Sequence, residues 1–139
     1  MQILNSERLT PERLNPKQLN NELDSNLWPT FERFSGEVPS LQFELLINQS
    51  LNYFEGHFPE QAVLPGVVQI HWAGELAMRL FCCSGFCQLK SVKFNSVILP
   101  QTKVNLGLDY NDQSGKLKFS YFNSEQRFSS GIMLFEATQ

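Results

Sequence analysis

The chain has 139 residues, a net charge of −3, 42% hydrophobic side chains and 18% charged side chains. Its length fits one domain with a substantial core and is too short for two. The net negative charge does not favour a nucleic-acid partner, and no run of about 18 apolar residues predicts a membrane span. The first residues lack a charged and then apolar stretch, so we do not expect a signal peptide.

The N-terminal segment, residues 1–26, is polar, and Pro11 and Pro16 interrupt any long helix. We predict a loosely ordered arm there that holds one short helix at most. The first aromatic side chains come with Trp28 and Phe31, so we expect the folded domain to span residues 27–139. Gly36 and Pro39 then indicate a turn.

The rest of the chain predicts strands around one helix. A half-buried strand is indicated by four apolar residues that alternate with others, namely Leu41, Phe43, Leu45 and Ile47. From Gly66 to about residue 83, apolar residues fall on nearly all sides of a helix, which predicts that the helix is buried and that Gly85 ends it. Four more strands are predicted near residues 89–99, 103–110, 116–123 and 127–136, with a hairpin turn at 111–115. One long helix with an antiparallel sheet of five or more strands is an α+β fold.

Three cysteines, Cys82, Cys83 and Cys87, lie near the end of the predicted helix. An odd number of cysteines without a secretion signal favours reduced thiols in a cytoplasmic protein. A metal site would need a fourth ligand and a better spacing. We therefore expect structural thiols and no bound metal.

The segment from Tyr53 to Ile70 places a histidine, His57, in a turn fixed by glycine and proline, shortly before a helix that begins at Pro65-Gly66. A base beside a helix N-terminus suits proton removal next to a carbonyl, because the helix dipole and free N–H groups favour the developing negative charge. A lone histidine is more often structural, however, and Pro-Gly is also an ordinary way to begin a helix. The pattern by itself leaves both interpretations open.

The same residues carry a family resemblance. Gly56-His57-Phe58-Pro59, four further residues, and Leu64-Pro65-Gly66-Val67 resemble the signature of the hot-dog-fold 3-hydroxyacyl-(acyl carrier protein) dehydratases of the FabA/FabZ type. The run from residue 64 to residue 73 is most similar to the ApeI-like branch, which is associated with aryl-polyene biosynthesis. This resemblance implies a curved antiparallel sheet wrapped around one long central helix.

The resemblance also implies roles for individual residues. His57 would be the general base that removes the α-proton of a 3-hydroxyacyl thioester. The Gly66 N–H would donate to the thioester carbonyl as the enolate forms, since a residue without a Cβ permits close approach. The expected substrate contacts around these two residues are Phe58, Pro65, Gly66 and Val67.

His71 stands where the family has a carboxylate that assists departure of the hydroxyl group. Protonated, His71 would be a general acid toward that hydroxyl. Glu75 lies four residues later on the same helix face, and we hypothesise that it holds His71 in its protonated form. The alternative is that Glu75 is a solvated or otherwise satisfied carboxylate, and the sequence does not separate the two.

The implied function is a (3R)-hydroxyacyl-[acyl carrier protein] dehydratase that forms trans-2-enoyl thioesters in fatty-acid or polyene biosynthesis. No metal or organic cofactor is implied, because the thioester itself acidifies the α-proton. Because the family carboxylate is replaced, a non-catalytic acyl-thioester-binding subunit and a hot-dog thioesterase stay open as alternatives.

The resemblance further implies a homodimer or higher homo-oligomer, in which His57 of one chain faces the partner's His71. An acidic acyl carrier protein would deliver the phosphopantetheine-linked substrate to a locally basic surface. The candidates for that surface are Arg79, Lys90, Lys93 and Lys103.

Overall fold

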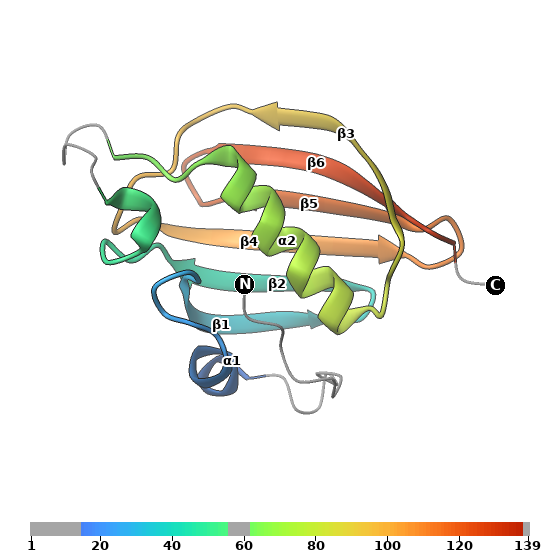
Figure 1. Cartoon of the computed structure of the whole chain (residues 1–139), viewed down its shortest axis with the longest axis horizontal. Helices are drawn as coiled ribbons and strands as arrows, with labels where there is room; N and C mark the ends of the chain where they lie inside the picture. The colour runs from blue at the N-terminus through green and yellow to red at the C-terminus, as the bar shows by residue number, and fades with distance from the viewer. Residues whose placement is uncertain (1–14, 56–61, 138–139) are drawn as a thin grey trace.

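Six antiparallel strands form one sheet, and the long helix α2 crosses one face of it diagonally (Figure 1). The computed structural model describes residues 15–55 and 62–137. The helices are α1 (Pro16–Glu22) and α2 (Gly66–Leu80), with a short 3-10 turn, η1, at Asn52–Phe54. The strands are β1 (Thr30–Glu37), β2 (Ser40–Leu46), β3 (Phe86–Phe94), β4 (Lys103–Asn111), β5 (Lys116–Phe122) and β6 (Arg127–Phe135).

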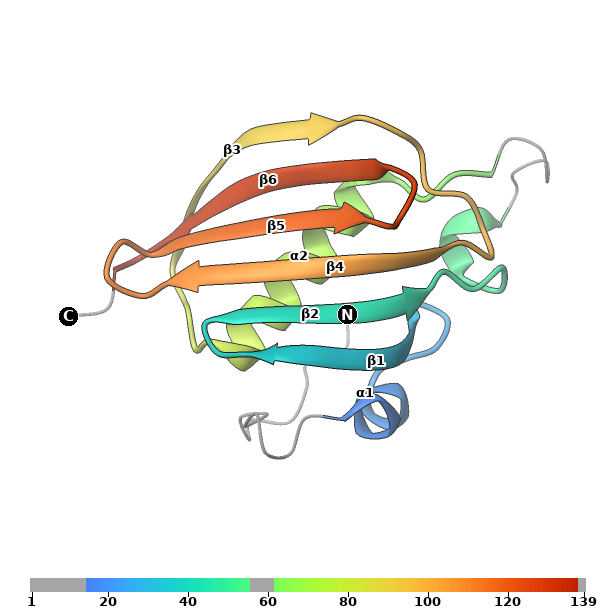
Figure 2. The same ribbon diagram turned by 180° about the vertical axis from the view of Figure 1, so that it is seen from behind.

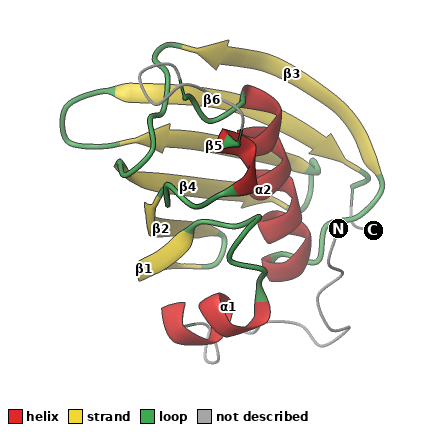
Figure 3. Ribbon diagram, turned by 60° about the vertical axis from the view of Figure 1, so that its left-hand side comes forward, coloured by secondary structure: helices red, strands yellow, loops and turns green. Residues whose placement is uncertain are grey.

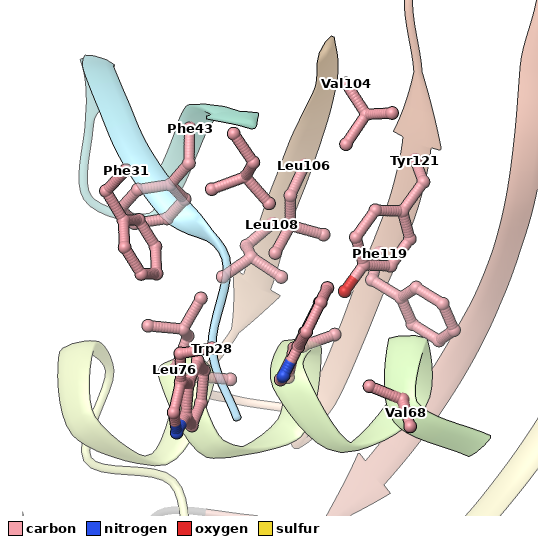
Figure 4. Packing of buried hydrophobic residues seen from close by; sticks show 14 of the residues in the cluster. Trp28, Phe31, Phe43, Val68, Leu76, Val104, Leu106, Leu108, Phe119 and Tyr121 are labelled. Atoms are coloured by element: carbon pink, nitrogen blue, oxygen red, sulfur yellow. The ribbon is translucent and has the colours of Figure 1, made fainter. Parts of the chain in front are cut away.

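The strands lie in the order β1-β2-β4-β5-β6-β3, so β1 and β3 form the two edges. The core lies between the sheet and α2, where alternate residues of β4 and β5 face Val68 and Leu76 of the helix (Figure 4). Seen from behind, no described helix covers the opposite face of the sheet (Figure 2). The predicted α+β fold, a curved antiparallel sheet around one long helix, is confirmed.

The N-terminal segment contributes more to the core than its polar composition indicates. Pro16 begins α1 instead of interrupting it, because the first helical turn needs no N–H from that residue. Asn15 caps the helix, accepting a hydrogen bond from the Gln18 N–H at 2.8 Å. Leu19 and Leu23 are buried in the same core as the sheet residues. Residues 16–23 therefore pack with the domain and do not form a separate arm.

The strand β1 was not predicted, since it lacks a period-two pattern. In β1 only Phe31 is buried, and it forms an edge-to-face contact with Phe43 of β2. Helix α1 lies beside this edge (Figure 3). There the Asn20 side chain donates to the Phe31 carbonyl at 2.9 Å and accepts from the Phe31 N–H at 2.8 Å. Asn20 thus pairs with the edge as a neighbouring strand would.

The other edge of the sheet is open. Strand β3 pairs with β6 on one side only. Of the seven large hydrophobic side chains that are exposed in the described part of the chain, five belong to β3, the loop after it and the start of α2. These five are Val67, Phe86, Phe94, Val97 and Leu99. We call this surface, together with the free backbone of β3, the β3 edge.

Helix α2 is buried on one side only, which differs from the prediction of a helix surrounded by apolar contacts. The seven residues buried against the sheet are Val68, Gln69, Trp72, Ala73, Leu76, Ala77 and Leu80. On the other side Val67 is 72% exposed and Met78 is also exposed. The helix ends at Leu80, about one turn earlier than predicted. No helix among the described residues is both long and apolar enough to cross a membrane.

Candidate active site

The N-terminus of α2 presents two backbone N–H groups without a helical partner. Pro65 is the N-cap, and its carbonyl accepts from the N–H groups of Val68 at 3.1 Å and Gln69 at 3.3 Å. The first N–H groups of a helix have no acceptor within the helix, and proline offers no capping side chain. Neither Gly66 N–H nor Val67 N–H is bonded to any other described residue. Together with the helix dipole, they form a donor pair suited to a developing oxyanion.

Gly66 is the position where the aromatic ring of Phe94 reaches the helix. A Cβ added to Gly66 would lie 2.5 Å from Cζ of Phe94, which is far below contact distance. Phe94 ends β3 and is 53% exposed, so its ring can turn away from the helix without disturbing the core. The missing Cβ at Gly66 therefore lets an aromatic ring, or a planar thioester in its place, approach the two N–H groups.

His71 lies one turn beyond Val67 on the side of α2 that the sheet leaves uncovered. Its ring is half-buried and packs against Trp28, with 6.0 Å between ring centroids and a tilt of 45°. Trp28 in turn stacks on Trp72, whose indole N–H donates to the Leu27 carbonyl at 2.9 Å. The aromatic pair therefore supports the imidazole, which stays partly exposed.

The structure does not join His71 to Glu75. Glu75 is half-buried on the same helix face, one turn later, but no hydrogen bond or ion pair connects these two described side chains. The hypothesis that Glu75 keeps His71 protonated therefore stays a prediction. His57 and Phe58 lie outside the described residues.

A buried polar cluster below the N-terminus of α2 was not predicted. The side chain of Gln69 contacts Ser129 of β6, and the Tyr121 hydroxyl of β5 donates to the Gln69 backbone carbonyl at 2.7 Å. Figure 4 shows this hydroxyl pointing from the sheet toward the helix. Burial raises the pKa of Tyr121 well above its ordinary value, so the phenol stays neutral. One sequence signal was available, a glutamine within an otherwise apolar stretch of helix.

A cavity lined by described residues lies away from these groups. It has a volume of about 1040 Å³ and is lined by the C-terminal end of α2, the β1–β2 turn and the β4–β5 hairpin. Val38, Leu80 and Asp112 are among its lining residues, and none of the predicted site residues is. We place the candidate site at the N-terminus of α2, because the N–H groups of Gly66 and Val67 and the side chain of His71 belong to its first two turns.

Comparisons with known proteins agree with this fold. The dehydratase heterocomplex ApeI:P from Xenorhabdus doucetiae contains a similar chain, with 28% identity and a TM-score of 0.69, covering 78% of this chain and 97% of that one. A protein of unknown function from Erwinia carotovora subsp. atroseptica has 25% identity and a TM-score of 0.70, covering 79% of this chain and 97% of that one. No curated protein sequence matches this chain.

A more distant structure shares the fold alone. The dehydratase domain from the CurF module of the curacin polyketide synthase has 19% identity and a TM-score of 0.59, with 84% of this chain and 45% of that one covered. The sequence model of the ApeI-like family, described as ApeI dehydratase, matches residues 34–132, more than half of the chain. The hot-dog fold and the dehydratase resemblance are thereby confirmed, and the chain belongs to the ApeI-like dehydratase family.

Proposed function

We propose that this protein dehydrates a (3R)-hydroxyacyl thioester, carried on the phosphopantetheine arm of an acyl carrier protein, to the trans-2-enoyl thioester. The observation that carries this proposal is the pair of N–H groups of Gly66 and Val67 without a described acceptor, with His71 one helical turn further along the same helix. The N–H pair would polarise the thioester carbonyl, and the imidazole would act one helical turn away, toward the β-carbon.

The proposed reaction removes one water molecule. His57 takes the α-proton, and the electron pair of the broken C–H bond becomes the double bond between the α- and β-carbons. The bond from the β-carbon to the hydroxyl breaks, and the leaving oxygen takes a proton from His71 to form water. His57 then either releases its proton to solvent while His71 takes one up from solvent, or passes the proton to His71, and either route restores both residues. Negative charge gathers on the thioester oxygen during the first step, where the helix N-terminus stabilises it.

A second subunit is part of the proposal, since the site is open in the single chain. The β3 edge exposes five large apolar side chains beside a strand with unpaired backbone groups, and such a surface typically marks an interaction site. We propose that a second copy covers it through the β3 edge. The similarity to a chain of a heterocomplex makes a different subunit the alternative partner.

We place the docking site for the acidic carrier protein at the exposed lysines of β3, because strand side chains stand on the faces of a sheet and not at the backbone edge that the second copy would cover. Lys93 is exposed and precedes Phe94, whose ring lies over the start of α2. Lys90 is exposed on the same strand. Lys103 is a weaker candidate, because its ammonium lies 3.7 Å from the carboxylate of Glu32. A Lys93→Glu change should therefore raise the KM for a carrier-linked substrate more than that for a small thioester.

The test of the proposal is to incubate the purified chain with a 3-hydroxyacyl carrier protein and to follow loss of water by mass spectrometry. We expect the enoyl product, and much less of it with His57→Ala. Release of the free acid would instead identify a thioesterase. Binding of the acyl carrier protein without turnover, with turnover appearing once a second dehydratase subunit is added, would identify an acyl-binding subunit of a heterocomplex.

A further inference from the structure

Gln69 is a buried polar side chain in a helix face that otherwise packs apolar groups. It is 2% exposed, and within residues 15–55 and 62–137 Ser129 is the only other buried residue among the Asn, Gln, Ser, Thr and charged side chains. Burying an amide is unfavourable unless its donors and acceptor find partners. An apolar residue at position 69 would fill the same space without that requirement, so stability alone does not account for the glutamine.

The contacts of the Gln69 amide fix its orientation. Its Nε2 group donates to the Leu64 carbonyl at 3.3 Å, and its Oε1 accepts from the Ser129 hydroxyl at 2.6 Å. The Leu64 carbonyl can only accept a hydrogen bond, so the amino side of the amide must face it. Ser129 belongs to β6, so one hydrogen bond ties the Gln69 side chain to the sheet. The other ties it to Leu64, which lies in the segment just before α2.

Leu64 is restrained on both sides of its backbone. Its N–H donates to the Ile98 carbonyl at 2.8 Å, and its carbonyl accepts from Gln69. This carbonyl lies in the planar peptide group that joins Leu64 to Pro65. The ring of Pro65 restricts φ at the next bond, and φ is −59° here. With the peptide plane and φ both fixed, only ψ of Pro65 remains to set the direction of the Gly66 N–H.

We propose that Gln69 is a positioning residue, which aims the N–H groups of Gly66 and Val67 at the thioester carbonyl by holding the Leu64 peptide. This inference rests on the proposed function, since it assigns those N–H groups to the substrate. A small misplacement of groups that stabilise a transition state reduces turnover by as much as about a hundredfold. The effect should fall on kcat, because charge on the thioester oxygen develops in the transition state.

The chain offers a matched control in Tyr121. Its hydroxyl is buried in the same cluster and bonds the Gln69 backbone carbonyl, and it does not contact Leu64. Tyr121→Phe removes a buried hydrogen bond of the same cluster without releasing the Leu64 carbonyl. A purely structural cluster would lose activity with either change, in proportion to lost stability.

The experiment compares wild type, Gln69→Glu, Gln69→Leu combined with Ser129→Ala, and Tyr121→Phe in steady-state kinetics across pH. We expect kcat to fall about tenfold to a hundredfold in both Gln69 variants, with KM within about threefold of wild type. Relative to wild type, Gln69→Glu should recover kcat as pH falls, because a protonated carboxyl can donate to the Leu64 carbonyl and a carboxylate cannot. Tyr121→Phe should keep kcat despite a lower melting temperature.

A second readout is independent of turnover. In ¹H–¹⁵N spectra, the amide resonances of Gly66 and Val67 should move in the Gln69 variants and stay in place in Tyr121→Phe. Unchanged resonances, or a loss of kcat in Tyr121→Phe as large as in Gln69→Glu, would overturn the inference. If wild type does not turn over the thioester, the proposed function fails, and the amide resonances alone then decide whether Gln69 positions the helix start.

Discussion

At Gly66, the residue that would best stabilise the helix differs from the residue that the proposed reaction requires. A methyl group on Gly66 fits an α-helix, where alanine is favoured over glycine by about 1 kcal/mol. The same methyl group would fill space that the Phe94 ring now occupies at the start of the helix, where we place the thioester. At this residue, a change that suits the helix is expected to block the site.

We therefore predict that Gly66→Ala folds with a melting temperature close to that of wild type and loses most of its turnover, by about a hundredfold for loss of the N–H contacts. Gly74→Ala is the control on the same helix, because its added methyl group would meet only the flexible Met133 side chain, at 3.3 Å from its Sδ. Calorimetry and an enoyl-product assay of both variants check this. Full activity in Gly66→Ala would place the thioester elsewhere.

Cys83 gives a prediction about pH. Burial raises the pKa of its thiol from 9.0 to about 12, whereas Cys82 and Cys87 are exposed. The folded chain keeps this proton where the unfolded chain loses it, so the contribution to stability is full below pH 9.0 and is lost as pH rises toward about 12. Denaturant unfolding of wild type and Cys83→Ala across this range should show a steeper alkaline loss in wild type. Equal slopes would contradict it.

The sequence predicted some of the site at this scale and missed the rest for a physical reason. Gly66 and His71 could be placed, because both follow from where the helix begins. The bond between Gln69 and Ser129 joins residues 60 positions apart, and no local pattern reports which strand residue will lie under a helix. The roles expected of His57 and Glu75 stay predictions.

Among the elements, α1 and β1 show how a polar segment stabilises a sheet. The Asn20 amide satisfies both backbone groups of Phe31, whose side chain is buried at the same point. Without it, the partly buried N–H and carbonyl of Phe31 would lose their hydrogen-bond partner beside a core residue. Helix α1 therefore ends the sheet on the β1 side.

We predict that Asn20→Ala lowers the free energy of unfolding by about 1–2 kcal/mol, because two partly buried backbone groups lose their hydrogen-bond partner. The neighbouring Asn21 is exposed on the same helix, and Asn21→Ala should change the stability by a few tenths of a kcal/mol at most. Urea denaturation followed by circular dichroism measures both. A stability loss shared equally by the two variants would mean that helix propensity, and not the edge contact, is responsible.

Element prediction succeeded where one face of a strand is buried. The alternation in β4 places Val104, Leu106 and Leu108 in the core, as the period-two pattern predicts. It failed for β1, because an edge strand with exposed residues on both faces carries no such period. A short helix was expected within residues 1–26 but could not be placed, because Pro16 is compatible both with the start of a helix and with an interruption of one.

For the whole molecule, the two edges of the sheet differ in whether another part of the chain covers them. The β1 edge is covered by α1, while the β3 edge combines unpaired backbone with exposed apolar side chains, a combination that invites strand pairing with another chain. A pair of chains joined there would form one continuous sheet and bring the start of one α2 toward the other subunit.

We predict that the chain self-associates through the β3 edge and that Val97→Asp, which buries a charge in that contact, shifts it to monomer and lowers turnover with it. Val38→Asp is the control, since Val38 is also exposed but lies in the turn between β1 and β2. Sedimentation velocity of the three proteins measures this. A monomeric wild type that becomes larger only with a different subunit would replace self-association by a heterocomplex.

The most direct measurement of the central claim, that His71 performs the task of the family carboxylate at the start of α2, is the interconversion of a 3-hydroxyacyl thioester and its enoyl product followed by ultraviolet absorbance. We predict turnover by wild type, a loss of at least about a hundredfold in His71→Ala, as expected for a general acid, and partial recovery in His71→Glu. Wild-type turnover that His71→Ala leaves unchanged would contradict the claim.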